Sequence, residues 1–106
     1  MKKEILEEIK ELNGIDGKTL PERVLKFNEE FGEFSAELGK FIGITHKPYD
    51  KPHLIEEMAD AMQCLCSIYV DVCDKADFTM EDVFNEITEK NKKWREKAPQ
   101  YTKNLK

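Results

Sequence analysis

The sequence predicts an all-α protein built as a four-helix bundle. Apolar residues recur at helical spacing in four segments, and short connections rich in glycine or proline separate these segments. No alternation of apolar and polar residues predicts a strand. The chain has 106 residues. We therefore expect a single all-α domain over residues 1–106, with its small core at about residues 20–95.

The first two helices have recognisable start and stop signals. Apolar residues predict a first helix over residues 2–12, which the pair Asn13-Gly14 is expected to end. The run Thr19-Leu20-Pro21-Glu22 fits a capping box with proline in the first turn, so a second helix begins there. We expect this helix to reach about Ile42, where Gly43 stops it.

The third helix is the most apolar element of the chain. A loop over residues 43–52, punctuated by prolines, precedes a helix predicted from about His53 to Cys73. Apolar residues cover well over half of its circumference, so we expect it to be buried on several sides. One small monomer can hardly cover such a surface, which favours a homo-oligomer.

The fourth helix is expected to follow a turn at residues 77–82. Thr79 and Asp82 have the spacing of a helix cap. The helix is predicted to reach about Lys97 and to be closed by Pro99. The remaining segment, residues 100–106, is polar, and we expect it to be mobile.

Charge and cysteine content narrow the class of protein. The net charge of −5 argues against a protein that coats DNA or RNA. No apolar run has the length of a membrane span, and the first residues lack the apolar core of a signal peptide. Cys64, Cys66 and Cys73 match no zinc motif and no disulfide framework. We expect a cytoplasmic protein with reduced cysteines and no nucleic-acid or membrane partner.

Two pairs of acidic residues are the strongest functional signal. Glu30 and Glu33 form one pair, Glu57 and Asp60 the other, and residues three apart share a helix face. Two such helices side by side could direct four carboxylates to one point. Because like charges at that distance repel strongly, a bound divalent cation would explain the arrangement.

Spacing alone is a weak signal, because about four or five acidic pairs three residues apart arise by chance in so acidic a chain. The position of each acidic residue around its helix indicates better whether it is buried or at the surface. Glu57 projects inside the apolar arc of its helix, with Asp60 at its border. Glu30 lies at the edge of the preceding helix's apolar arc. Glu33 and Glu37 lie further out on that side, and Glu29 faces the opposite way. The alternative for Glu57 is a buried ion pair with lysine or arginine.

The nature of the ligands favours magnesium. No histidine follows a glutamate at the Glu-x-x-His spacing of di-iron bundles, and we interpret His46 and His53 as loop or cap residues. An all-carboxylate site favours Mg²⁺, with Mn²⁺ as a possible substitute. Asn91, in the apolar stripe of the fourth helix, either caps a backbone group or faces the carboxylates. In the second case Lys90 would supply a cation for phosphate.

These motifs resemble the all-α nucleoside triphosphate pyrophosphohydrolases of the MazG type. The run Glu29-Glu30-Phe31-Gly32-Glu33-Phe34 is similar to the family's first acidic motif, and Glu56-Glu57-Met58-Ala59-Asp60 to its second. Lys90-Asn91-Lys92-Lys93 resembles its basic segment. The resemblance extends from about Leu20 to Arg95.

The resemblance implies an activity and a ligand set. It implies hydrolysis of a nucleoside triphosphate, often deoxy or non-standard, to the monophosphate and pyrophosphate. Magnesium would sit on Glu30, Glu33, Glu57 and Asp60, and Lys90 and Asn91 would contact the substrate. Homodimers or homotetramers would share the active-site cavity. The alternatives are a phosphoribosyl-ATP pyrophosphohydrolase, a relative that binds nucleotides without turnover, and a non-catalytic helical interaction protein.

Overall fold

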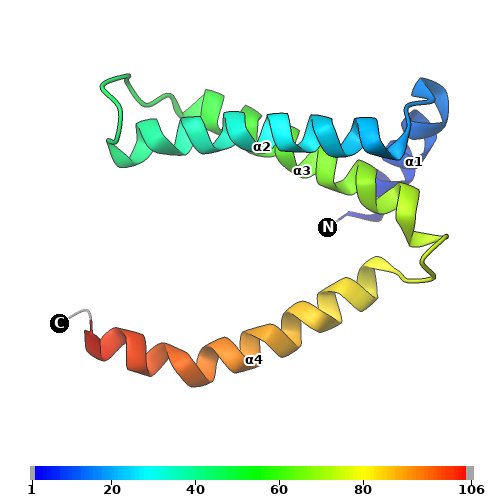
Figure 1. Ribbon diagram of the computed structural model, residues 1–106. Helices are drawn as coiled ribbons and strands as arrows, with labels where there is room; N and C mark the ends of the chain where they lie inside the picture. The colour runs from blue at the N-terminus through cyan, green and yellow to red at the C-terminus, as the bar shows by residue number, and fades with distance from the viewer. Residues whose placement is uncertain (1, 105–106) are drawn as a thin grey trace. The chain divides into compact units, whose positions relative to one another are not determined.

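The protein is all-α in a computed structural model that describes residues 2–104 (Figure 1). The helices are α1 (Lys3–Asp16), α2 (Leu20–Ile42), α3 (Lys51–Cys73) and α4 (Met80–Asn104). No strand occurs within residues 2–104, so the predicted fold class is confirmed. The chain divides into two compact units, residues 1–75 and residues 76–106, and each is described by itself. The single-domain prediction stays a prediction.

Helices α2 and α3 form an antiparallel pair (Figure 1). The predicted capping box starts α2. The Thr19 hydroxyl accepts a hydrogen bond from the Glu22 backbone N–H at 3.4 Å, and the Glu22 carboxylate accepts one from the Thr19 N–H at 3.0 Å. Gly43, at φ 81°, ends α2 after Ile42 as predicted, because glycine adopts left-handed backbone geometry without a steric penalty.

The predicted end of α1 is wrong. The helix continues through the Asn13-Gly14 pair to Asp16, and Gly17 at φ 62° supplies the left-handed cap. Asn13 is held within the helix because its side-chain amide donates to the Ser67 carbonyl and to the Asp71 carboxylate, both at 3.0 Å. Contacts with α3 therefore override the usual preference of asparagine for helix ends.

The start of α3 also differs from the prediction. The helix begins at Lys51, two residues before His53. Pro52 lies in its first turn, where a missing backbone N–H costs nothing and the fixed φ of proline suits a helix. His53 therefore belongs to the first turn of α3 rather than to the loop, a difference that bears directly on the site below.

Arg23 ties the three helices of the first unit together. Its side chain is only 6% exposed. The guanidinium donates to Asp16 at the end of α1 and to Asp71 and Ser67 on α3. Helical phase gave no indication of this buried charge. The network fixes the register of α1 and α2 against α3.

The second unit consists mainly of α4. The predicted cap is confirmed, because the Asp82 carboxylate accepts from the Thr79 N–H at 2.8 Å and the Thr79 hydroxyl accepts from the Asp82 N–H at 3.2 Å. The predicted stop at Pro99 is wrong, since α4 continues to Asn104. Pro99 lies inside α4, where it leaves one backbone hydrogen bond unmade. Residues 100–104 are thus helical, and residues 105–106 lie outside the described part.

The apolar core of the first unit is small. Its buried apolar residues are Ile9, Ala61 and Cys66. Large apolar side chains of α2 and α3 are exposed instead, among them Phe31, Met58, Met62 and Leu65. In the described chain α3 is therefore less buried than its composition predicts. The three cysteines are free thiols, and none of the described helices is long and apolar enough to cross a membrane.

Candidate metal centre

Three of the four predicted ligands meet where α2 faces α3. Glu30 on α2 and Glu57 and Asp60 on α3 each place a carboxylate oxygen within 4.8 Å of the other two. Glu30 is 7% exposed and Glu57 is 9% exposed, and Asp60 is half-buried. The two acidic motifs thus converge as their spacing and phase predicted. The assignment of these residues as metal ligands stays a prediction.

Glu33 joins the cluster through Glu30. Its carboxylate forms a second group with those of Glu29 and Glu30, again with oxygens within 4.8 Å. The negative charge of Glu30, together with burial and the charge of Glu57, raises the pKa of Glu33. Glu29 is exposed as expected, but its carboxylate reaches the same group although helical phase pointed it the other way.

In the described part of the chain, three buried carboxylates each have one oxygen without a hydrogen-bond partner. Within the described chain, Oε2 of Glu30, Glu37 and Glu57 is buried and has no hydrogen-bond partner. A buried carboxylate oxygen without a donor is costly, so each of these atoms calls for a ligand. An oxygen-only donor set is what hard divalent cations such as Mg²⁺ prefer. The residues present therefore fit such an ion.

One lysine partly compensates the cluster. Lys26 Nζ lies 2.7 Å from Glu30 Oε1. This hydrogen bond is the main reason that the pKa of Glu30 is lowered and that of Lys26 is raised. Glu57, in contrast, has no lysine or arginine at ion-pair distance among the side chains of residues 2–99. The buried ion pair considered as an alternative for Glu57 is therefore not found there.

His53 occupies a position that sequence reasoning missed. Its Nδ1 lies 3.2 Å from Glu37 Oε1, and its Nε2 lies 3.1 Å from Glu57 Oε1. Lys40 Nζ is 2.6 Å from the same oxygen of Glu37. The interpretation of His53 as a loop or cap residue is wrong. Glu37 is also more buried than predicted, at 5% exposure.

A helical spacing could have indicated part of this arrangement. His53 precedes Glu57 by four residues, which places both on one face of α3. The contact from His53 to Glu37 crosses between two helices, and no local spacing in the sequence reveals it. His46, by comparison, lies in the exposed loop after α2 as expected.

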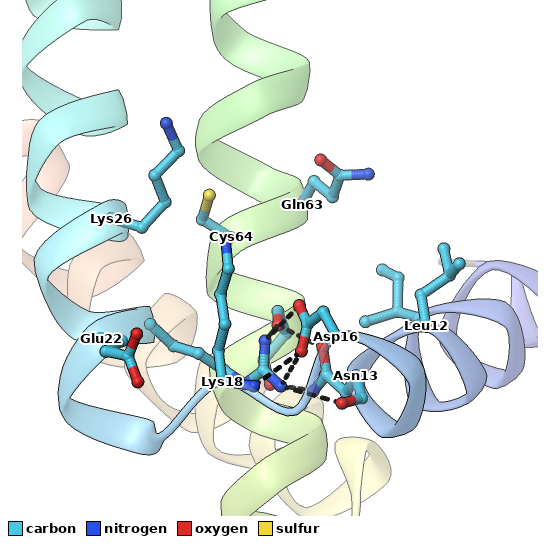
Figure 2. Close-up of a pocket in the computed structure, with 11 residues that line it drawn as sticks. Leu12, Asn13, Asp16, Lys18, Glu22, Lys26, Gln63 and Cys64 are labelled. Atoms are coloured by element: carbon cyan, nitrogen blue, oxygen red, sulfur yellow. Dashed lines mark hydrogen bonds and ion pairs between the residues drawn. The ribbon is translucent and has the colours of Figure 1, made fainter.

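A pocket of about 250 Å³ lies in the first unit, around the Arg23 network (Figure 2). Residues of α1, α2 and α3 line it. Lys26 and Cys64 stand in its upper part in Figure 2, and Asp16 and Asn13 lie lower, at the Arg23 network. Burial, followed by the negative charge of Glu30, raises the pKa of the Cys64 thiol. Lys26, the partner of Glu30, is the residue that the pocket lining and the acidic cluster share.

The predicted substrate contacts belong to the second unit. Lys90 and Asn91 lie on α4, and both are exposed. Their proposed contact with substrate stays a prediction.

Comparison with known proteins gives a family. A family model described as the MazG nucleotide pyrophosphohydrolase domain matches residues 1–98, nearly the whole chain. No curated protein and no solved structure matches the chain. The family is one of nucleotide pyrophosphohydrolases, and the convergent acidic motifs described above lie within the matched residues. The chain belongs to the MazG nucleotide pyrophosphohydrolase family.

Proposed function

We propose that the protein hydrolyses a nucleoside triphosphate to its monophosphate and pyrophosphate in a magnesium-dependent reaction. Deoxynucleotides or non-standard nucleotides are the expected substrates. Glu30, Glu33, Glu57 and Asp60 would hold the metal. The observation that carries this proposal is the convergence of Glu30, Glu57 and Asp60, with two of their oxygens buried and unpartnered.

Electrostatics supports a cation at this point. Two carboxylates ~4 Å apart repel by ~4 kcal/mol at an effective dielectric of ~20, and four of them multiply that cost. Lys26 offsets a single charge at Glu30. The raised pKa of Glu33 has the same origin, because the cluster favours the neutral form of its own member. A divalent cation would remove this repulsion.

The chemistry follows from the charge of the substrate. Bound Mg²⁺ would neutralise phosphate oxygens and lower the pKa of a water molecule. Glu30, Glu57 and Asp60 hold their carboxylates in place from two packed helices. A carboxylate of the cluster would accept a proton from the attacking water. The water oxygen bonds to the α-phosphorus, the bond from that phosphorus to the bridging oxygen breaks, and pyrophosphate leaves.

Cationic side chains would assist the leaving group. Lys90 and Asn91 of α4 are the proposed substrate contacts, and Lys47 and Lys51 add positive charge around the loop before α3. Stabilising the negative charge that develops on pyrophosphate lowers the barrier of the reaction.

A substrate panel tests the proposal. The protein is incubated with Mg²⁺ and deoxynucleoside, ribonucleoside and non-standard triphosphates, with phosphoribosyl-ATP included. We expect pyrophosphate release with at least one of them. Glu57→Gln should abolish release, whereas Glu56→Gln, at an exposed neighbouring position on α3, should retain it. Absence of release from every nucleotide at high enzyme concentration would contradict the proposal and favour a binding or interaction protein.

We also infer that copies of the chain associate, as a homodimer or homotetramer in the cytoplasm. Phe31, Met58, Met62 and Leu65 are large apolar side chains that are exposed, and association of copies would cover such side chains. The free cysteines suit a reducing compartment. Light scattering after gel filtration should give two or four times the chain mass, and a purely monomeric species would contradict the inference.

A further inference from the structure

His53 lies between two buried carboxylates of different helices. Glu37 on α2 contacts one ring nitrogen and Glu57 on α3 contacts the other, at 3.2 and 3.1 Å. Glu37 is itself fixed by Lys40 at 2.6 Å. These contacts form a continuous polar chain, Lys40–Glu37–His53–Glu57, which ends at the acidic cluster.

We propose that His53, held by Glu37, is a positioning residue that orients the Glu57 carboxylate for metal binding. This inference rests on the metal centre of the proposed function. The contact with His53 occupies Oε1 of Glu57, while Oε2 of Glu57 is buried and unpartnered within the described chain. One oxygen of Glu57 is therefore used for orientation, and the other is available to a cation.

The physical reason lies in the length of the glutamate side chain. An unrestrained Glu57 can rotate its carboxylate about three side-chain bonds and must lose that freedom when it binds an ion. Hydrogen bonds to ligating carboxylates fix their direction beforehand, and removing such a partner typically weakens metal binding about 10- to 100-fold. Glu37 does the same for the imidazole ring, because it fixes Nδ1.

Exposure makes a purely structural role of His53 a poor explanation. The His53 side chain is 42% exposed, whereas those of Glu37 and Glu57 are 6% and 11% exposed. Removing the ring leaves little cavity, so it should affect folding much less than metal binding. Burying the carboxylates of Glu37 and Glu57 lowers the stability of the folded protein. Their burial beside His53 therefore favours a role for His53 at the acidic cluster.

Calorimetric titration of the metal-free protein with Mn²⁺ tests the proposal. We expect His53→Ala to weaken Mn²⁺ binding about 10- to 100-fold. His53→Gln should recover much of the loss, because its amide nitrogen can take the place of Nε2 beside Glu57. Glu37→Gln should also weaken binding, since it loosens the ring. His46→Ala, at an exposed histidine in the loop, is the matched control and should bind as the wild type does.

Each outcome separates this inference from the function it rests on. If the wild type binds Mn²⁺ and His53→Ala binds it equally well, or if His53→Gln is no better than His53→Ala, the positioning role is overturned while the metal centre stands. If His53→Ala is unfolded, as judged by loss of its helical circular-dichroism signal, the Mn²⁺ affinities of the wild type, His53→Gln and Glu37→Gln are compared instead. Equal Mn²⁺ affinities in these three proteins would overturn the proposal. A wild type that binds no Mn²⁺ overturns both.

Discussion

At Glu30 a lysine and a metal ion would compete for one carboxylate. Lys26 Nζ lies 2.7 Å from Glu30 Oε1, and its side chain is 51% exposed. Lys26→Met removes a positive charge beside a cation site, so we expect Mn²⁺ to bind a few-fold more tightly, with a smaller gain at high salt. Calorimetry at two ionic strengths measures the change.

Lys3→Met provides the control for this substitution. Lys3 is an exposed lysine of α1 whose pair with Glu7 at 4.0 Å is far more solvated than that of Lys26. Its removal should leave Mn²⁺ affinity unchanged. Weaker binding in Lys26→Met would mean that the ammonium supports the site instead of competing for it.

Asp16 makes the stability of the folded protein depend on pH, and this dependence does not involve the metal centre. Arg23 and the Lys18 backbone N–H lower the pKa of Asp16 from 3.8 to about 2. Because the folded-state pKa is depressed, the stabilisation is complete above the unfolded value and is lost as pH falls through about 4 to 2. The melting temperature of Asp16→Asn should fall less steeply than that of the wild type as the pH is lowered from about 4 to 2. Parallel curves would contradict the assignment.

At the scale of elements, Arg23 holds α1, α2 and α3 together. Its guanidinium is almost fully buried and donates to Asp16 and Asp71. Arg23→Met keeps much of the volume but leaves both carboxylates without their partner. Because these carboxylates are partly exposed, we expect a loss of about 1–3 kcal/mol in the free energy of unfolding. Urea denaturation measures it.

The control for Arg23 is a surface arginine. Arg95→Met on α4 removes an exposed guanidinium and should change the free energy of unfolding by less than about 0.5 kcal/mol. If Arg23→Met were equally mild, the network would contribute little to the packing of α1.

The helices were predictable where local chemistry sets their ends. The Thr19 and Thr79 caps and the glycine at residue 43 act within a few residues, so the sequence alone indicates them. The prediction failed at Asn13, which α3 holds inside α1, and at Pro99, which a helix can accommodate. In the first case a contact from a distant segment decides, and in the second the described residues show no contact that explains why the helix continues.

At the scale of the whole molecule, the α2–α3 hairpin assembles the candidate site. Helical phase predicted that Glu30, Glu57 and Asp60 would turn toward each other, because apolar arcs show which faces pack. Phase could not show which polar residues meet across the interface. The contacts of His53 with Glu37 and of Arg23 with Asp71 both depend on the register between helices. The partners of buried polar groups therefore needed the structure.

The melting temperature in millimolar Mg²⁺ is the most direct test of the claim that converging carboxylates hold a divalent cation. An ion that binds only the folded protein stabilises it, by ~2.7 kcal/mol at ~100 times its Kd. We predict that Mg²⁺ raises the melting temperature of the wild type and that Glu57→Gln, still folded, shows no rise. A wild type that does not respond to Mg²⁺, or a Glu57→Gln variant that responds fully, would contradict the account.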